Sequence, residues 1–181
     1  MSLLWKECGL PERHKTFKAS QNALEAWKTQ WDKLQPEIGM GIIGVILGKR
    51  GAGKTQMAAC AVREACEKEL SAIYCKAIDF FLDVRASYRK DSQSTEKDVI
   101  NQYRKPKLLV IDAIENRGET DFENRLLDTL IDKRYDDCTD TLLISNQDEK
   151  AFAASMGASI IDRIHECGIM IICNWESFRR K

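Results

Sequence analysis

A glycine-rich turn, GKRGAGKTQMAA at residues 48–59, limits the possible folds of this chain more than any other feature. Gly48, four further residues and then Gly53-Lys54-Thr55 match the phosphate-loop pattern GxxxxGK[ST]. Glycines let the backbone curl so that its N–H groups point inward, and a following helix adds its positive end. The pattern predicts a nucleoside triphosphate site. The residues expected to hold the nucleotide are Gly48, Gly51, Ala52, Gly53, Lys54, Thr55 and Gln56.

Composition allows one ordinary domain and excludes few partners. The chain has 181 residues, 44% of them apolar, with 28 basic and 28 acidic side chains. A net charge of zero neither predicts nor excludes a nucleic-acid partner. The seven cysteines form no CxxC pair, which favours reduced thiols over zinc ligands. The start of the chain does not resemble a signal peptide, and no apolar run approaches the ~20 residues of a membrane span. We therefore expect a cytoplasmic protein that does not enter a membrane.

Apolar runs of strand length alternate with helical patterns from residue 41 onward. Residues 1–40 are interpreted as an irregular lead-in and a helix from Ser20 to about Leu34, and residues 41–181 as one core. Strands are predicted at 41–47, 71–75, 107–112, 141–146 and 168–173. Helices are predicted at 54–70, 77–90, 95–103 and 120–135, with one or two more in 148–166. This alternation predicts an α/β fold, with a parallel sheet covered by helices on both faces.

Two of these helices carry more detailed expectations. In 77–90, the residues at helical spacing are Ile78, Phe81, Leu82, Arg85 and Tyr88. In 120–135, the sequence TDFE predicts a capping box, in which Thr120 caps the helix while Glu123 reaches back.

Asp112 ends the apolar run LLVID, where a carboxylate can hold the water shell of Mg²⁺ together with the Thr55 hydroxyl. Lys54 is expected to reach the β and γ phosphates of ATP. Hydrolysis usually needs a second carboxylate beside this aspartate, but the next residue is Ala113, and a methyl group cannot polarise water. Glu115 can replace it, hydrolysis can be slow, or the chain can be a laboratory variant whose base was removed. The sequence leaves all three open.

Further features follow LLVID in order: a capped helix ending in DKRYDD, then LLISNQDE, IIDRI and NWESFR. Together they resemble the AAA+ ATPase core of the DnaC-type helicase loaders and of the related IstB transposition ATPases, from about Cys8 onward. Many families share the phosphate loop alone, whereas IIDRI and NWESFR behind it are specific. The resemblance implies a P-loop fold of AAA+ type with a five-stranded parallel sheet. No separate C-terminal lid domain is expected, because eight residues follow the last predicted strand.

The resemblance also implies roles for three residues. Asn146 is similar to the sensor of the γ-phosphate. Arg163 resembles an arginine finger, which acts on the nucleotide of a neighbouring subunit and therefore requires self-association into a ring or spiral. Arg179 resembles a second sensor supplied by the tail. The implied partners are single-stranded DNA and a replicative helicase or a transposase.

Two departures from the family pattern stand out. Ala113 replaces the second carboxylate, and the chain begins where the helicase-binding module of the loaders would already have ended. We interpret it as a core fragment or as a short relative that binds its partner differently. Residues 1–19 are then expected beside the adenine, with Pro11 and Phe17 packing on the base.

Single-stranded DNA requires basic and aromatic side chains facing a channel. Three groups have that composition: Arg85, Tyr88, Arg89 and Lys90; Tyr103, Arg104, Lys105 and Lys107; and Lys133, Arg134 and Tyr135.

Three functions are compatible with the sequence. The first is an ATP-switched loader or remodeller of a helicase or transposase. The second is a small nucleotide kinase, although residues 113–140 contain no obvious arginine-rich lid. The third is a nucleotide-binding scaffold that hydrolyses little, which Ala113 favours.

Overall fold

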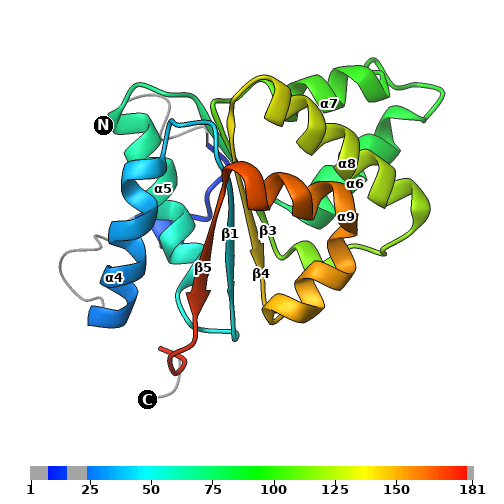
Figure 1. Cartoon of the computed structure of the whole chain (residues 1–181). Helices are drawn as coiled ribbons and strands as arrows, with labels where there is room; N and C mark the ends of the chain where they lie inside the picture. The colour runs from blue at the N-terminus through cyan, green and yellow to red at the C-terminus, as the bar shows by residue number, and fades with distance from the viewer. Residues whose placement is uncertain (1–7, 16–23, 179–181) are drawn as a thin grey trace.

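Five parallel strands form the central sheet of the computed structural model, which describes residues 8–15 and 24–178 (Figure 1). Their order across the sheet is β2-β3-β4-β1-β5. The strands are β1 (Ile43–Gly48), β2 (Ala72–Lys76), β3 (Leu108–Asp112), β4 (Asp140–Ser145) and β5 (Gly168–Cys173). The predicted five-stranded parallel sheet is confirmed, with each strand shifted by no more than two residues from its expected start.

Helices cover both faces of the sheet, as predicted. One face carries α4 (Glu25–Leu34) and α5 (Lys54–Glu67). The other carries α6 (Ala77–Ser87), α7 (Glu96–Arg104), α8 (Asp121–Asp136) and α9 (Glu149–Cys167) (Figure 1). Each face has its own apolar core, one centred on residues such as Trp27 and Met57 and the other on residues such as Phe80 and Leu130.

Strand β1 is buried on both sides because it lies between β4 and β5. Ile46 enters the core beneath α5, while Val45 and Leu47 enter the core beneath α8 and α9. Because all strands run the same way, their carboxyl ends meet at one edge of the sheet. The glycine-rich turn after β1 and Asp112 at the end of β3 therefore lie at the same edge.

Helix α6 buries a face that shares one residue with the set noted for its helical spacing. Its buried residues are Ala77, Phe80, Phe81 and Val84, whereas Ile78, Leu82 and Tyr88 are 38%, 51% and 57% exposed. Both sets have helical spacing, and only Phe81 belongs to both. Packing on the sheet selects the set with the two adjacent phenylalanines, so an apolar stripe is left facing solvent.

The first long helix begins later than expected. Ser20 lies outside the described residues, and α4 begins at Glu25, after an extended Leu24 that is half-exposed. Trp27, Trp31 and Leu34 recur at helical spacing and face the core. A short 3₁₀ turn, η1 (Gln35–Glu37), follows and contains Pro36.

The capping box predicted at α8 is half correct. Thr120 accepts a hydrogen bond from the Glu123 N–H, but the Glu123 carboxylate turns away and pairs with Arg85 at 2.7 Å. A reciprocal capping box occurs instead at the start of α7, between Thr95 and Asp98. Arg85 and Glu123 are 38 positions apart in the chain, so the local sequence could not predict their ion pair.

A buried arginine and a buried aspartate stabilise the amino ends of the strands, at the edge of the sheet opposite the glycine-rich turn. Arg134 donates to the carbonyls of Tyr103, Arg104, Pro106 and Asp140 and to the Thr141 hydroxyl, and burial lowers its pKa to about 10. Asp140 accepts the N–H groups of Gly39, Gly41 and Ile42. Burial raises the pKa of Asp140, although these three donors oppose the shift.

Helix α9 is two helices joined by a kink. Gly157 has φ of 71° and ψ of 151° in its middle, and an added Cβ there would meet nothing within 4 Å. The prediction of one or two helices in this segment is therefore satisfied by a bent pair. Across the described ranges, no helix is both long and apolar enough to cross a membrane.

Candidate nucleotide site

The turn after β1 needs glycine at three positions. Gly48, Gly51 and Gly53 have φ of 142°, 86° and 83°, a region that side chains rarely adopt. Space adds a second reason at Gly48, where a Cβ would lie 2.2 Å from the Cys173 carbonyl oxygen. The glycines thus let the loop pass close to the end of β5 before Lys54 begins α5.

Donors from outside the loop hold three successive loop carbonyls. The Phe178 N–H binds the Gly51 oxygen at 3.0 Å, the Trp175 indole binds the Ala52 oxygen at 3.0 Å, and the Trp27 indole binds the Gly53 oxygen at 3.3 Å. In a trans peptide the C=O and the following N–H point in opposite directions. The N–H groups of Gly53 and Lys54 are therefore directed away from these donors, as an anion-binding loop requires.

Lys54 is 6% exposed, and its ammonium lies within the loop. It donates to the carbonyls of Gly48 at 2.6 Å and Lys49 at 3.0 Å, and to Asn146 Oδ1 at 2.8 Å. Asn146 follows β4, so the structure brings the predicted lysine and the predicted sensor into direct contact.

Asp112 accepts three hydrogen bonds at the end of β3. Thr55 Oγ1 and the Tyr74 hydroxyl donate to its Oδ2 at 2.8 and 2.6 Å, and the Ala113 N–H donates to its Oδ1 at 2.8 Å. A hydroxyl and a carboxylate this close are the hard oxygen ligands that Mg²⁺ prefers, so these residues fit the ion. Burial, and then the neighbouring Asp112 carboxylate, raise the pKa of Tyr74.

Tyr74 was missing from the predicted site. In sequence it looks like one more apolar residue of a strand, SAIYC, and only the pairing of β2 with β3 brings its hydroxyl to Asp112. Trp27 had no predicted role in the site, and Trp175 appeared only as part of NWESFR. Their donation to the loop carbonyls depends on tertiary packing.

The segment after Asp112 reverses direction within one residue. Ala113 is left-handed, with φ of 56° and ψ of 49°, and the 3₁₀ turn η2 (Ile114–Asn116) follows. Glu115 thereby returns toward β4, where its Oε1 accepts the Asn146 side-chain N–H. Within the described part of the chain, the buried Glu115 Oε2 has no hydrogen-bond partner.

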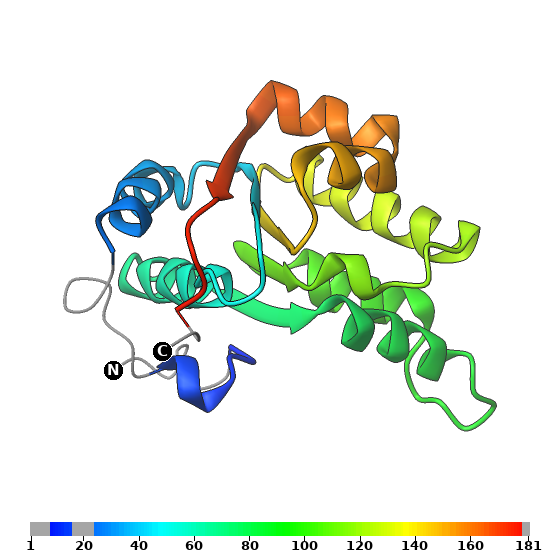
Figure 2. The same ribbon diagram turned by 90° about the horizontal axis from the view of Figure 1, so that it is seen from below.

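A cavity of about 690 Å³ opens beside these groups, within the range typical of ligand sites. The short helix α2 (Glu12–Lys15) packs on α5 beside it, as the view onto this edge shows (Figure 2). His14 and Gln56 hydrogen-bond each other. The lining includes Pro11, Arg13, His14, Arg50, Gly51, Gly53, Lys54, Thr55, Gln56, Tyr74, Lys76, Asp112, Ala113, Asn116, Asn146 and Phe178. Phe17 and Arg179 lie outside the described residues.

Comparison with known families agrees with this geometry. Residues 43–181 match the family model described as "IstB-like ATP binding protein". The chain belongs to the IstB-like family. The "Replicative helicase loader DnaC" of Escherichia coli K12 is 23% identical over 179 residues, 98% of this chain and 71% of that protein. DnaC of Buchnera aphidicola subsp. Baizongia pistaciae is 24% identical over 138 residues, 76% of this chain and 56% of its own length.

Solved structures share the AAA+ fold of this IstB-like chain. The crystal structure of the DnaC helicase loader has a TM-score of 0.73 and 13% identity, covering 94% of this chain and 99% of that one. The replication initiator DnaA bound to AMPPCP and single-stranded DNA has a TM-score of 0.71 and 18% identity, covering 92% of this chain and 51% of that one. The predicted family resemblance and fold class are confirmed.

Arg163 of the IstB-like chain lies far from its own phosphate loop. It occupies the end of α9, just before Gly168, which pairs with Ile43 at the start of β1. The loop follows the other end of that strand. Arg163 donates to Asp132 of α8 and to Ser159, and its guanidinium lies 5.3 Å from the centre of the Tyr135 ring. Its role as an arginine finger stays a prediction.

Two of the three groups predicted to contact DNA lose members to the interior. Tyr103 is 5% exposed and donates to Asp83, and Arg134 is fully buried. Arg104 pairs with Asp137 at 2.6 Å. In the group at the C-terminal end of α6, Tyr88, Arg89 and Lys90 remain exposed, although Arg85 is paired with Glu123. Composition alone could not separate buried cations from surface cations.

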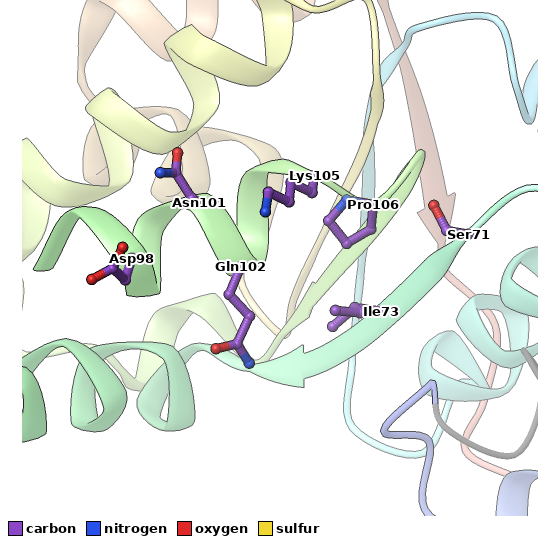
Figure 3. Close-up of a pocket in the computed structure, with 7 residues that line it drawn as sticks. All are labelled: Ser71, Ile73, Asp98, Asn101, Gln102, Lys105 and Pro106. Atoms are coloured by element: carbon purple, nitrogen blue, oxygen red, sulfur yellow. The ribbon is translucent and has the colours of Figure 1, made fainter. Parts of the chain in front are cut away.

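A second pocket, of about 540 Å³, lies between α7 and the edge strand β2 (Figure 3). Its lining combines Ser71 and Ile73 with Asp98, Asn101, Gln102, Lys105 and Pro106. Asp98 is already used to cap α7. This pocket contains no part of the phosphate loop, whereas Lys54, Thr55 and Asp112 meet in the larger cavity, which is therefore the candidate site.

Proposed function

We propose that this chain is an ATP-hydrolysing loader of a replicative helicase, similar to DnaC, which assembles on single-stranded DNA. The nucleotide part rests on one observation: Lys54, Thr55, Asp112 and Asn146 form hydrogen-bonded contacts around the phosphate loop. The loader part rests on the likeness to DnaC along nearly the whole chain. A cytoplasmic location belongs to the same proposal.

The chain's own groups would hold ATP in a simple way. Lys54 exchanges the Gly48 and Lys49 carbonyls for β- and γ-phosphate oxygens, and Asn146 contacts the γ-phosphate. Thr55 and Asp112 would hold Mg²⁺, and the ion would supply positive charge that offsets the negative charge of the triphosphate. Because Ala113 offers no carboxylate, we expect turnover to be slow.

Self-association would complete the site. An arginine that cannot reach its own phosphate loop is suited to the loop of a neighbouring copy, where it would spread positive charge over the transition state. The position of Arg163 at the opposite edge of the sheet supports this arrangement. Repeating the contact from copy to copy would build a ring or a spiral.

Single-stranded DNA would contact the exposed side of α6. Ile78, Leu82 and Tyr88 project there, and Arg89 and Lys90 follow immediately. Bases stack on aromatic faces, and cations attract the phosphates between them. DnaA, whose fold is similar, has been solved with single-stranded DNA bound.

A second candidate is a transposition ATPase, which the IstB-like family model favours. The two differ in the protein that the assembly binds, a replicative helicase or a transposase. A nucleotide kinase is a third alternative, and transfer of phosphate to a nucleotide acceptor would displace the loader proposal.

The decisive experiment combines binding, size and turnover. A fluorescent ATP analogue should bind the wild type and not Lys54→Ala. With that analogue and a labelled oligonucleotide, the wild type should sediment as an oligomer. Its affinity for the oligonucleotide should fall as the salt concentration rises from about 50 to about 200 mM. Analogue affinity unchanged by Lys54→Ala would end the nucleotide proposal. Analogue binding with no salt-sensitive oligonucleotide binding would end the DNA part.

A further inference from the structure

Glu115 lies two residues after position 113, where the usual second carboxylate is missing. We propose that Glu115 is the catalytic carboxylate, which orients the attacking water and takes its proton. This inference rests on the proposed ATPase function and names the residue that performs its chemical step.

The backbone explains how a residue two positions later can serve. Ala113 is left-handed and hydrogen-bonded to Asp112 through its N–H. The turn that follows folds Glu115 back over the carboxyl edge of β4 instead of letting it continue along β3. Ala113, Asn116 and Asn146 line the nucleotide cavity. Glu115 is not itself a lining residue, but it is hydrogen-bonded to Asn146, which is.

A chain of two hydrogen bonds connects Glu115 to the phosphate-binding cation. Asn146 donates to Glu115 Oε1 and accepts from Lys54 Nζ at 2.8 Å. One side-chain amide therefore separates the carboxylate from the ammonium expected to bind the γ-phosphate. A water between that phosphate and the carboxylate would need contacts of about 2.6–3.2 Å to Glu115, and this short connection makes them geometrically possible.

The second carboxylate oxygen is free to accept such a water. Oε2 of Glu115 is buried and, among the described residues, has no donor. Asp112, in contrast, already accepts from Thr55, Tyr74 and the Ala113 N–H. Glu123 also has one buried oxygen without a donor, but its other oxygen pairs with Arg85, whereas that of Glu115 is held by the cavity residue Asn146.

The proposed step is balanced. The water oxygen bonds to the γ-phosphorus while the bond from that phosphorus to the bridging oxygen breaks. The bridging oxygen leaves with the electron pair on ADP, and the water proton passes to Glu115 Oε2. Asn146 keeps the carboxylate in place through Oε1 and contacts the γ-phosphate side through Lys54. Both products of hydrolysis are formed without another reactant.

Substitution of Glu115, with a matched control, tests the assignment. Glu115→Gln preserves size and removes the base, so single-turnover phosphate release should fall by about 100-fold or more. Its affinity for a fluorescent ATP analogue should stay within about twofold, because the change affects the chemical step and not binding. Glu119→Gln, an exposed residue in the same loop, is the matched control and should behave as the wild type.

Rescue separates a chemical role from a structural one. Combining Ala113→Glu with Glu115→Gln restores a carboxylate next to Asp112 and should recover at least about tenfold of the lost rate. Glu115→Gln within about threefold of the wild-type rate would overturn the proposal. So would a loss of analogue affinity parallel to the loss of rate.

Failure of the wider function gives a different result. If the wild type does not bind the ATP analogue, the proposed ATPase function itself fails. If it binds but hydrolyses ATP only after Ala113→Glu, Glu115 is not the base, and a nucleotide-binding loader that hydrolyses little remains.

Discussion

Trp175 offers the sharpest test of how the phosphate loop is shaped. Its indole N–H donates to the Ala52 carbonyl at 3.0 Å from 123 positions away. Trp175→Phe removes this donor and keeps an aromatic ring of similar bulk. The loop can then reorient the Ala52 peptide, whose following N–H belongs to Gly53 in the anion-binding turn.

A neutral hydrogen bond contributes about 0.5–1.5 kcal/mol net. If that energy fixes the loop for phosphate, its loss should weaken ATP-analogue binding by about 2–13-fold. Trp27→Phe, which loses a longer contact of 3.3 Å to Gly53, should have a smaller effect. Trp31→Phe, a buried tryptophan one turn further along α4 that stacks on Trp27, is the control.

Analogue titration and thermal unfolding of the same three variants decide between loop and fold. Trp175→Phe should raise Kd more than Trp27→Phe, and Trp31→Phe should leave Kd unchanged even if it lowers Tm. If Trp175→Phe lowers Tm by about 2–4 °C but does not alter Kd, the hydrogen bond supports the fold and not the phosphate loop.

Four further changes test other parts of the structure. Arg163→Ala should leave ATP binding by isolated subunits intact and abolish the rise of phosphate release with protein concentration; loss of monomer binding would contradict the finger assignment. Tyr74→Phe removes one donor to Asp112 and should raise the Mg²⁺ concentration needed for analogue binding by about tenfold, measured by magnesium titration. Arg134→Met leaves several buried carbonyls without their donor and should lower the free energy of unfolding in urea by about 3 kcal/mol. Asp140→Asn tests pH dependence, because burial raises the pKa of Asp140 in the folded state. The wild type should exceed the variant in stability most below the unfolded pKa of about 3.9, and this difference should shrink as pH rises through the folded pKa. Urea unfolding at a series of pH values measures the difference.

Features that depend on a short stretch of chain could be predicted from the sequence. The loop from Gly48 to Thr55 contains its own glycines, cation and hydroxyl, and the strand before it consists of apolar, largely β-branched residues. Asp112 could be placed because it ends another such strand. Parallel strands then bring these two segments to one edge, so the core of the site followed from local patterns and one rule of topology.

Features that depend on distant partners could not be predicted. Tyr74 looks like a core residue until β2 pairs with β3. Glu123 had a local role available as a capping partner, but the ion pair with Arg85 took it. Arg134 belongs to a basic and aromatic group typical of a DNA contact, but it lies on the face of α8 that packs into the interior. On α6, two interleaved stripes satisfied the same periodicity, and only contact with the sheet selected one of them.

The pair between Arg163 and Asp132 has a consequence for the proposed assembly. Its side chains are 23% and 50% exposed, and partly exposed pairs of this kind contribute at most about 1 kcal/mol. A lone carboxylate on an approaching copy would bind Arg163 only as strongly as Asp132 does. A triphosphate carries several negative charges and would bind Arg163 more strongly than Asp132 does. The pair with Asp132 would therefore be weak enough for Arg163 to leave it when a neighbouring copy carries a nucleotide. The same pair would disfavour association between copies that carry none.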